Sequence, residues 1–278
     1  MKAKKSLGQN FLKSELALNK IIEAGEIKTD DIILEIGPGK GALTEKLLEK
    51  AGVVVAVEKD RELFEFLKEK FVKEITEKKL ILINDDILEF DPKKTVLEFF
   101  KGPRSSGSLS QPDHLKNSKL FSYKIIANIP YNITGAILKK FLTEKNQPER
   151  MVLMVQHEVA KRIVASDKKE SILSVSVKAY GEPKMVMKVG ARYFSPAPKV
   201  DSAIIVIKNI SRQVFEKNEV NEEKFWETVK AGFAHKRKKL SSNLKSLKNY
   251  KNSILIESLG NKRAEDLALE DWISLAKQ

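Results

Sequence analysis

Two short motifs carry residue types that could bind a nucleoside. Residues 34–41 read Leu-Glu-Ile-Gly-Pro-Gly-Lys-Gly, and glycines allow a backbone to turn sharply and to approach a ligand closely. Glu58 lies at the end of the next apolar run, where a carboxylate can accept hydrogen bonds from both ribose hydroxyls. Together the two motifs predict a pocket for a ligand that contains adenosine.

The glycine spacing separates two classes of cofactor. A dinucleotide-binding loop has the spacing G-x-G-x-x-G, with the pyrophosphate at the N-terminus of a helix. Here the spacing is G-x-G-x-G and Glu35 precedes it, and this acid would repel a pyrophosphate but suits an ammonium or a sulfonium. The loop therefore favours S-adenosylmethionine over NAD, while an NAD-dependent oxidoreductase and a turn without a ligand stay open. Asp86 is the expected acceptor for the adenine amino group, with Asp85 as the competing choice, and Ile87 is expected to pack on the ring.

Residues 128–131 read Asn-Ile-Pro-Tyr and follow another apolar run. The exocyclic nitrogen of adenine is a poor nucleophile because its lone pair is delocalised into the ring. The side-chain oxygen of Asn128 and the carbonyl of Ile129 could accept its two N–H bonds and draw the nitrogen toward tetrahedral geometry. Pro130 stiffens the turn because its ring fixes φ, and Tyr131 could stack on the base, as aromatic side chains do on unpaired bases. The motif predicts methyl transfer to an adenine amino group, which depends on in-line positioning more than on a strong base.

The elements that position these motifs are predicted from alternating patterns. Short β-branched runs, which are typical of buried strands, cover residues 32–36, 53–57, 80–83, 124–127 and 151–155. Helical spacing occurs between them, over residues 42–50, 61–74 and 133–142. This alternation predicts an α/β fold with a mostly parallel sheet and helices on both faces. A late antiparallel hairpin is predicted from residues 184–189 and 203–208.

The patterns also predict two domains. Residues 1–208 are expected to form the α/β domain, with an exposed insertion at residues 101–122, where turn formers replace apolar periodicity. Residues 209–278 show no strand pattern and are expected to form a small helical domain. Its predicted helices cover residues 222–233, 238–247 and 264–275.

The composition of the chain excludes several kinds of functional site and of protein. The chain has 278 residues, of which 42% are hydrophobic, as in a globular protein. It contains no cysteine, which excludes disulfides, thiolate catalysis and cysteine-bound metal, and its three histidines are too far apart in sequence to predict a metal site. No apolar run is long enough to span a bilayer and no export signal follows the basic start, so a soluble cytoplasmic protein without a membrane partner is expected.

The net charge of +13 comes from 51 basic and 38 acidic residues. Such an excess is typical of nucleic-acid binding, and a lysine-rich surface kept for solubility is the alternative. Residues 228–251 contain basic residues and no acid, and the apolar positions spaced for one buried helical face are Phe233, Leu240, Leu244 and Leu247. This pattern predicts a helix with one buried face and one basic face. The basic face would contact RNA phosphates, and the affinity of such contacts falls as the salt concentration rises.

Taken together, the motifs resemble those of the RNA adenine dimethyltransferase family, which includes KsgA-type and Erm-type enzymes. The matching segments follow the family's order along nearly the whole chain and cover residues 5–12, 34–41, 57–60, 128–131 and 194–202. The resemblance implies a Rossmann-like class I S-adenosylmethionine-dependent methyltransferase domain with a small all-helical C-terminal domain. It also implies N6,N6-dimethylation of two adjacent adenosines near the 3′ end of 16S rRNA in the immature small ribosomal subunit. The enzyme is expected to be a monomer that releases S-adenosylhomocysteine and uses no metal.

The resemblance implies roles for individual residues. Cofactor contacts are implied for Asn10, Leu12, Gly37, Gly39, Glu58, Lys59, Asp86, Ile87 and Asn128. Catalytic contacts are implied for Asn128, Ile129, Pro130, Tyr131 and Phe194. Tyr131 and Phe194 would enclose the target base, although Phe194 could instead be a core aromatic at a strand end. RNA contacts are implied for Lys236, Arg237, Lys238 and Lys239.

Two other functions stay open beside the small-subunit enzyme. One is an Erm-type 23S rRNA adenine methyltransferase that confers macrolide resistance, and the other is a ribosome-assembly factor that mainly binds RNA. Residues 5–8 and the basic segment 233–244 favour the KsgA branch.

Overall fold

The computed structural model describes residues 3–101, 122–247 and 258–277. The insertion predicted at residues 101–122 lies outside the described residues except at its two ends. Among the described segments, no helix is both long and apolar enough to cross a membrane.

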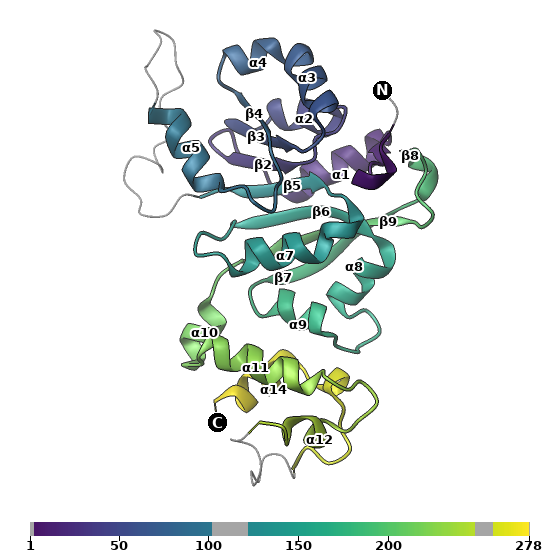
Figure 1. Cartoon of the computed structure of the whole chain (residues 1–278), viewed down its shortest axis with the longest axis vertical. Helices are drawn as coiled ribbons and strands as arrows, with labels where there is room; N and C mark the ends of the chain where they lie inside the picture. Colours follow the sequence, from purple (N-terminus) through teal and green to yellow (C-terminus); the bar gives the residue numbers. More distant parts are fainter. Residues whose placement is uncertain (1–2, 102–121, 248–257, 278) are drawn as a thin grey trace. The chain divides into compact units, whose positions relative to one another are not determined.

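A seven-stranded sheet with the order β4-β3-β2-β5-β6-β9-β7 lies at the centre of the α/β part (Figure 1). Its strands are β2 (Ile32–Ile36), β3 (Val53–Glu58), β4 (Leu80–Asn84), β5 (Lys124–Asn128), β6 (Arg150–Gln156), β7 (Glu182–Val189) and β9 (Ser202–Lys208). The strands from β4 to β6 pair in parallel, and β9 is antiparallel to β6. The prediction of a mostly parallel α/β sheet is confirmed.

The register of the parallel strands brings the predicted motifs together. β2 and β3 are buried at every position, which explains their continuous apolar runs. Ile36 pairs with Val57, and Glu58 pairs with Asn84 one strand further. The carboxyl ends of β2, β3, β4 and β5 therefore meet at one edge of the sheet, where ligands bind in open α/β folds.

The helices of this part are α1 (Glu15–Gly25), α2 (Ala42–Leu48), α3 (Arg61–Lys70), α4 (Val72–Thr76), α5 (Pro92–Lys101), α7 (Thr134–Thr143) and α8 (His157–Val164). The single helix predicted over residues 61–74 is wrong, because it breaks into α3 and α4 at Phe71. Phe71 has non-helical backbone angles (φ −111°, ψ 30°) and turns its buried ring toward Gly41. The sequence patterns missed α1, although Ser14 caps it by accepting a hydrogen bond from the amide of Ala17 at 3.2 Å.

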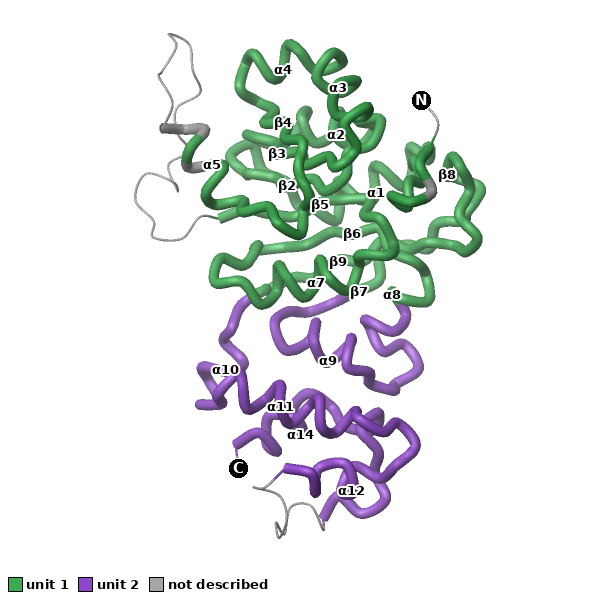
Figure 2. The backbone as a smooth tube through the Cα atoms, in the orientation of Figure 1, with its two compact units in different colours: residues 1–160, 184–210 green, residues 161–183, 211–278 purple. Residues whose placement is uncertain are grey.

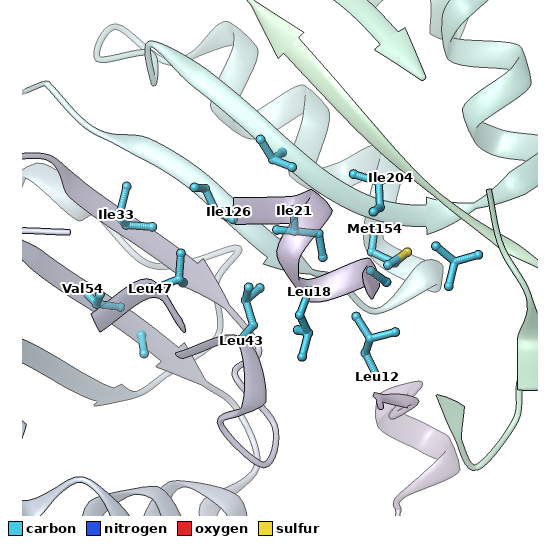
Figure 3. Close-up of a cluster of buried hydrophobic side chains, with 14 of the residues drawn as sticks. Leu12, Leu18, Ile21, Ile33, Leu43, Leu47, Val54, Ile126, Met154 and Ile204 are labelled. Atoms are coloured by element: carbon cyan, nitrogen blue, oxygen red, sulfur yellow. The ribbon is translucent and has the colours of Figure 1, made fainter. Parts of the chain in front are cut away.

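One hydrophobic cluster ties α1 and α2 to the sheet (Figure 3). Leu18 and Ile21 on α1 and Leu47 on α2 face side chains of the strands, including Ile33 and Ile126. Burial of such side chains stabilises the fold by roughly 1.5–3 kcal/mol each. Leu12 belongs to the same cluster, so the N-terminal segment is anchored in the core.

The chain divides into two compact units (Figure 2): residues 1–160 with 184–210, and residues 161–183 with 211–278. The predicted division after residue 208 places residues 161–183 with the α/β domain, whereas the structure groups them with the helical part. Tyr180 shows why: its ring centroid lies 5.6 Å from that of Phe215 and 6.2 Å from that of Trp226. Its hydroxyl accepts a hydrogen bond from Trp226 Nε1 at 3.0 Å and donates one to Glu222.

The second unit contains α9 (Ile172–Lys178), α10 (Gln213–Asn218), α11 (Glu222–Gly232), α12 (Leu240–Leu244), the 3-10 turn η5 (Ala264–Asp266) and α14 (Leu269–Ala276). The described part of the basic stretch, residues 228–247, does not form the single buried and basic helical face that its apolar spacing predicts. It runs from α11 through a loop to α12, which correspond to the separate helices predicted over residues 222–233 and 238–247. α11 ends at Gly232, where a Cβ atom would lie 2.3 Å from the ring of Trp272. The side-chain amide of Asn243 donates hydrogen bonds to the carbonyls of Gly232 at 2.6 Å and His235 at 3.1 Å, and these bonds hold the intervening loop.

Candidate functional site

The loop after β2 borders a cavity of about 540 Å³ at the carboxyl edge of the sheet. Gly37 has a φ of +64° and donates a backbone hydrogen bond to the carbonyl of Val57 at 2.9 Å. Gly41 has a φ of +81° and precedes α2, and a Cβ atom there would lie 2.6 Å from the ring of Phe71. Left-handed φ values and close packing explain why the loop uses glycine at these two positions.

The structure brings nearly all of the predicted cofactor and catalytic residues to this cavity. Its lining includes the predicted cofactor residues Asn10, Leu12, Gly37, Gly39, Glu58, Lys59, Asp86, Ile87 and Asn128. It also includes the predicted catalytic residues Ile129, Pro130 and Tyr131. In the described chain, no group of three or more histidine, aspartate or glutamate side chains could hold a metal ion.

Glu58 presents a buried carboxylate at the end of β3. It is 5% exposed, and its two oxygens accept hydrogen bonds from the amides of Gly39 at 3.1 Å and Asp60 at 2.9 Å. Burial raises the pKa of Glu58 above its usual range, and the backbone hydrogen bonds oppose that rise. These bonds fix the orientation of the carboxyl group beside the glycine loop, where it can accept further hydrogen bonds from hydroxyls.

Glu35 is almost fully buried at 1% exposure and also lines the cavity. Its Oε2 atom accepts a hydrogen bond from the hydroxyl of Thr44 at 2.7 Å. Burial raises the pKa of Glu35 to about 8, so the carboxyl group is mostly neutral at pH 7. A cation in the cavity would favour the ionised form, which couples ligand charge to the protonation of this residue.

Asp85 and Asp86 both line the cavity after β4. Asp86 Oδ2 accepts a hydrogen bond from Lys59 Nζ at 2.6 Å, and Oδ1 accepts one from the amide of Leu88 at 3.0 Å. The bond from Lys59 is the main cause that lowers the pKa of Asp86, followed by the bond from Leu88. Asp85 Oδ1 accepts a hydrogen bond from the amide of Asp86 at 2.7 Å. Asp86 is therefore an ionised acceptor whose position is set by a neighbouring lysine.

Asn128, at the end of β5, is tied to the N-terminal segment. Its side-chain Nδ2 donates a hydrogen bond to the carbonyl of Asn10 at 3.1 Å, and Asn10 Nδ2 donates one to the carbonyl of Gly8 at 3.1 Å. Because the amide nitrogen of Asn128 is used in this way, its Oδ1 atom is directed away from Asn10. The arrangement orients the acceptor oxygen that the predicted chemistry requires.

A polar clasp, made by Lys4, Gln9 and Asp60, holds the same N-terminal segment to the start of α3. Asp60 accepts hydrogen bonds from Lys4 Nζ at 2.8 Å and from Gln9 Nε2 at 2.7 Å, and it also caps α3. Burial alone would raise the pKa of Asp60, but the hydrogen bonds from Lys4 and Gln9 outweigh it and lower the pKa. Sequence reasoning missed this clasp, since only the helix cap of Asp60 carries a local signal.

Tyr131 and Phe194 lie in different surroundings. Tyr131 lines the cavity, and its hydroxyl lies 2.5 Å from Ser202 Oγ; burial raises the pKa of this tyrosine. Phe194 pairs with Leu12 in a two-stranded ribbon of β1 (Phe11–Leu12) and β8 (Phe194–Ser195), is 2% exposed and belongs to the hydrophobic cluster. Ser195 lines the cavity and Phe194 does not, so a base would reach the ring of Phe194 only if its neighbours moved.

The predicted RNA contacts Lys236, Arg237, Lys238 and Lys239 lie in the loop between α11 and α12 and are all exposed. They are thus grouped on one surface loop of the second unit. Leu240 and Leu244, just after the loop, are fully buried as the apolar pattern predicts.

Comparison with known proteins identifies the family. Over residues 1–278 the sequence matches the ribosomal RNA adenine dimethylase family. This chain belongs to that family. It is therefore a methyltransferase of the ribosomal RNA adenine dimethylase type, and its Rossmann-like fold is that of its structural neighbours.

Relatives of this dimethylase are similar over nearly their whole length. Ribosomal RNA small subunit methyltransferase A of Dehalococcoides mccartyi is 38% identical over 281 residues, which cover 99% of this chain and 88% of that protein. The protein of the same name from Fusobacterium nucleatum is 37% identical over 284 residues, or 99% of this chain and 97% of its own.

Two solved structures share the fold. The dimethyladenosine transferase from Plasmodium falciparum has a TM-score of 0.72 and 25% identity, with 95% of each chain covered. The 23S rRNA methyltransferase ErmE has a TM-score of 0.69 and 24% identity, with 97% of this chain and all of that chain covered. The likeness to ErmE shows the fold alone.

Proposed function

We propose that this chain dimethylates N6 of two adjacent adenosines near the 3′ end of 16S rRNA in immature small ribosomal subunits. The proposed methyl donor is S-adenosylmethionine, the product is S-adenosylhomocysteine, and the active form is a monomer. The names of its relatives specify the small subunit, which supports this substrate over 23S rRNA.

The observation that carries the proposal is the placement of Asn128. It lines the same cavity as the cofactor residues and Tyr131, and its Nδ2 atom donates a hydrogen bond to the carbonyl of Asn10. Oδ1 of Asn128 and the carbonyl of Ile129 would accept the two N–H bonds of the adenine amino group and direct its lone pair into the cavity. Tyr131, held by Ser202, would stack on the base. Positioning of this kind supplies most of what methyl transfer requires.

The residues of the cavity fit the proposed cofactor. Its volume of about 540 Å³ lies within the range of about 300–1,000 Å³ for ligand pockets. Glu58 would accept hydrogen bonds from the ribose and Asp86 from the adenine amino group. Glu35 would ionise beside a cationic ligand. When bound, S-adenosylmethionine supplies an electrophilic methyl group on a sulfonium.

Other residues would complete the proposed cofactor site. Leu12 and Ile87 are buried side chains on the cavity wall and would pack on apolar parts of the ligand. Lys59 would hold Asp86 in place through its 2.6 Å ion pair. Gly37 and Gly39 would allow close approach of the backbone.

RNA binding is proposed for the second unit. Lys236, Arg237, Lys238 and Lys239 would contact phosphates, which gives affinity without reading sequence. Phe194 is retained as a proposed base contact only for a state in which its packing has opened.

The decisive experiment is methylation in vitro of immature small subunits and, separately, of 23S rRNA, with mapping of the modified adenines. We expect dimethylation of two adjacent adenosines in the small subunit only. Modification confined to 23S rRNA would instead indicate the Erm-type function. RNA binding without methylation of either substrate would indicate an assembly factor.

An Asn128→Ala variant tests the chemistry within the site. We expect loss of methyl transfer while RNA affinity is retained, with cofactor affinity measured by calorimetry because the contact with Asn10 is also lost. Asn218→Ala is the matched control, since Asn218 also donates from Nδ2 to a carbonyl, that of Val214 at 2.8 Å, but lies in the second unit. Methylation by Asn128→Ala at the parental rate would contradict the assigned role.

A further inference from the structure

A second hollow, of about 560 Å³, lies in the first unit beside the strand ribbon β1–β8. Among the described residues, none of those assigned to the cofactor or to methyl transfer lines it. The two hollows adjoin: Lys13 and Ser195 line the cofactor cavity, and their near neighbours Ser14 and Tyr193 line the second hollow. The amide of Lys13 donates a hydrogen bond to the carbonyl of Tyr193 at 2.8 Å. This bond joins the two chain segments that line both hollows.

The stacked side chains of Arg192 and Tyr193 line this hollow. The guanidinium carbon of Arg192 lies 5.0 Å from the ring centroid of Tyr193, and Arg192 Nη2 lies 3.3 Å from the tyrosine hydroxyl. Both side chains are exposed, and Tyr193 is 40% exposed. An exposed aromatic ring of this size with a guanidinium over it is a surface on which a further planar group can stack.

The backbone that carries the stack is fixed. Arg192 and Tyr193 lie on the 3-10 turn η3 (Ala191–Tyr193), whose first amide donates a hydrogen bond to Asp201 Oδ1 at 3.0 Å. The second oxygen of Asp201 pairs with Lys188 Nζ at 2.9 Å. The bond from Lys188 is the main cause that lowers the pKa of Asp201. The acid is therefore engaged within the protein, and the positive charge of Arg192 faces the hollow.

We propose that the Arg192–Tyr193 stack binds a nucleotide of the RNA strand that flanks the target adenosine. The base would stack on the arginine–tyrosine pair, and Arg192 would face the neighbouring phosphate. The inference rests on the proposed function, because it assumes an unpaired RNA strand at the adjoining cavity. Stacking platforms beside basic side chains are the usual way in which proteins hold such strands.

The side chains that line the hollow favour RNA over a peptide as its ligand. A peptide that added a strand to the sheet would pair with the backbone of the edge strand β7 and would need neither Arg192 nor the Tyr193 ring. The exposed side chains here are two basic residues, Lys188 and Arg192, the aromatic Tyr193 and one apolar residue, Leu16. The basic and aromatic side chains lie next to the site that would hold the flipped-out base.

The test is the affinity of the full-length protein for a short single-stranded RNA with two adjacent adenosines, measured by fluorescence anisotropy. We expect Tyr193→Ala to weaken binding by about tenfold, because base–aromatic stacking contributes on that scale, and Tyr193→Phe to retain the parental affinity. Phe66→Ala is the matched control: Phe66 is 36% exposed beneath Lys70 Nζ at 6.0 Å, and it lines neither hollow.

An abasic scan of the same RNA locates the nucleotide. Removing the base that stacks on Tyr193 should weaken binding by wild type but not by Tyr193→Ala. Removing any other base should change the affinities of wild type and Tyr193→Ala by the same factor. Cofactor affinity, measured by calorimetry, should be the same in all variants, which also shows that they fold. If wild type methylates the RNA and Tyr193→Ala binds it equally well, or if the abasic scan shows no coupling, the stacking site is wrong and the proposed function stands. If wild type neither binds nor methylates any RNA, both proposals fail.

Discussion

Replacing Glu35 with glutamine tests whether the buried carboxyl group of this residue is neutral in the empty cofactor cavity. Glutamine has nearly the same shape as glutamate, can accept the same hydrogen bond from the hydroxyl of Thr44, and does not titrate. Wild type and Glu35→Gln should therefore differ in the pH dependence of their stability by the ionisation of one buried carboxyl group.

The magnitude follows from the pKa of that group in the two states. Burial raises the pKa of Glu35 from 4.5 to about 8, so between these values the folded protein holds one proton more than the unfolded chain. Stability then falls as the pH rises, by about 1.4 kcal/mol for each pH unit. The free energy of unfolding of Glu35→Gln should thus gain about 4 kcal/mol relative to wild type between about pH 5 and about pH 8, and the difference should stay constant at higher pH.

Urea unfolding of the cofactor-free protein at several pH values in this range measures the effect. Glu69→Gln is the matched control, because Glu69 is an exposed glutamate on α3. A plot of its free energy of unfolding against pH should run parallel to that of wild type. If the curves of Glu35→Gln and wild type also run parallel, the carboxyl group is ionised in the empty cavity and the reasoning is refuted.

Three further predictions concern the glycine loop after β2, the polar clasp of Lys4, Gln9 and Asp60, and the basic loop at residues 236–239. Gly41→Ala should lower the free energy of unfolding by about 2–4 kcal/mol, because a left-handed φ and a Cβ atom 2.6 Å from an aromatic ring both oppose a side chain. Gly37→Ala, where the nearest atom is 3.9 Å away, should cost only about 1–2 kcal/mol in denaturation experiments. Asp60→Asn should raise the Kd for S-adenosylmethionine several-fold in calorimetry, since the clasp loses its ion pair with Lys4, and an unchanged Kd would exclude a role for the clasp. Charge reversal at residues 236–239 should weaken RNA binding most at low salt and should flatten the dependence of log Kd on log salt; an unchanged slope would leave this loop a solvated surface.

The strands and the cavity could be predicted because their signals are local. A strand buried on both faces requires a continuous apolar run, so β2 was predicted at its observed bounds, Ile32–Ile36. Each motif directly follows such a strand, and the carboxyl ends of parallel strands meet at one edge. Residues as distant as Gly37 and Asn128 could therefore be assigned to one cavity.

The remaining features depend on contacts that leave no local signal. The break at Phe71 is set by its packing near Gly41, and the grouping of residues 161–183 with the second unit is set by Tyr180. The pairing of Lys4 with Asp60 spans 56 positions, and the burial of Phe194 follows from the pairing of β8 with β1. Periodicity and motif spacing describe neighbours in the chain, so they could not predict these partners.

The order of strands in the sheet has a consequence for biosynthesis. β9 lies between β6 and β7 although it follows both in the chain, so β6 keeps an open edge until residues 202–208 have been made. β8, which pairs with β1 beside the cofactor cavity, is also made late, whereas β1 precedes every other strand of the described chain. Since domains generally fold as units during synthesis, a nascent chain that ends before β8 should not retain the cofactor. The ability to bind it should be acquired only after residues 194–195 have been translated.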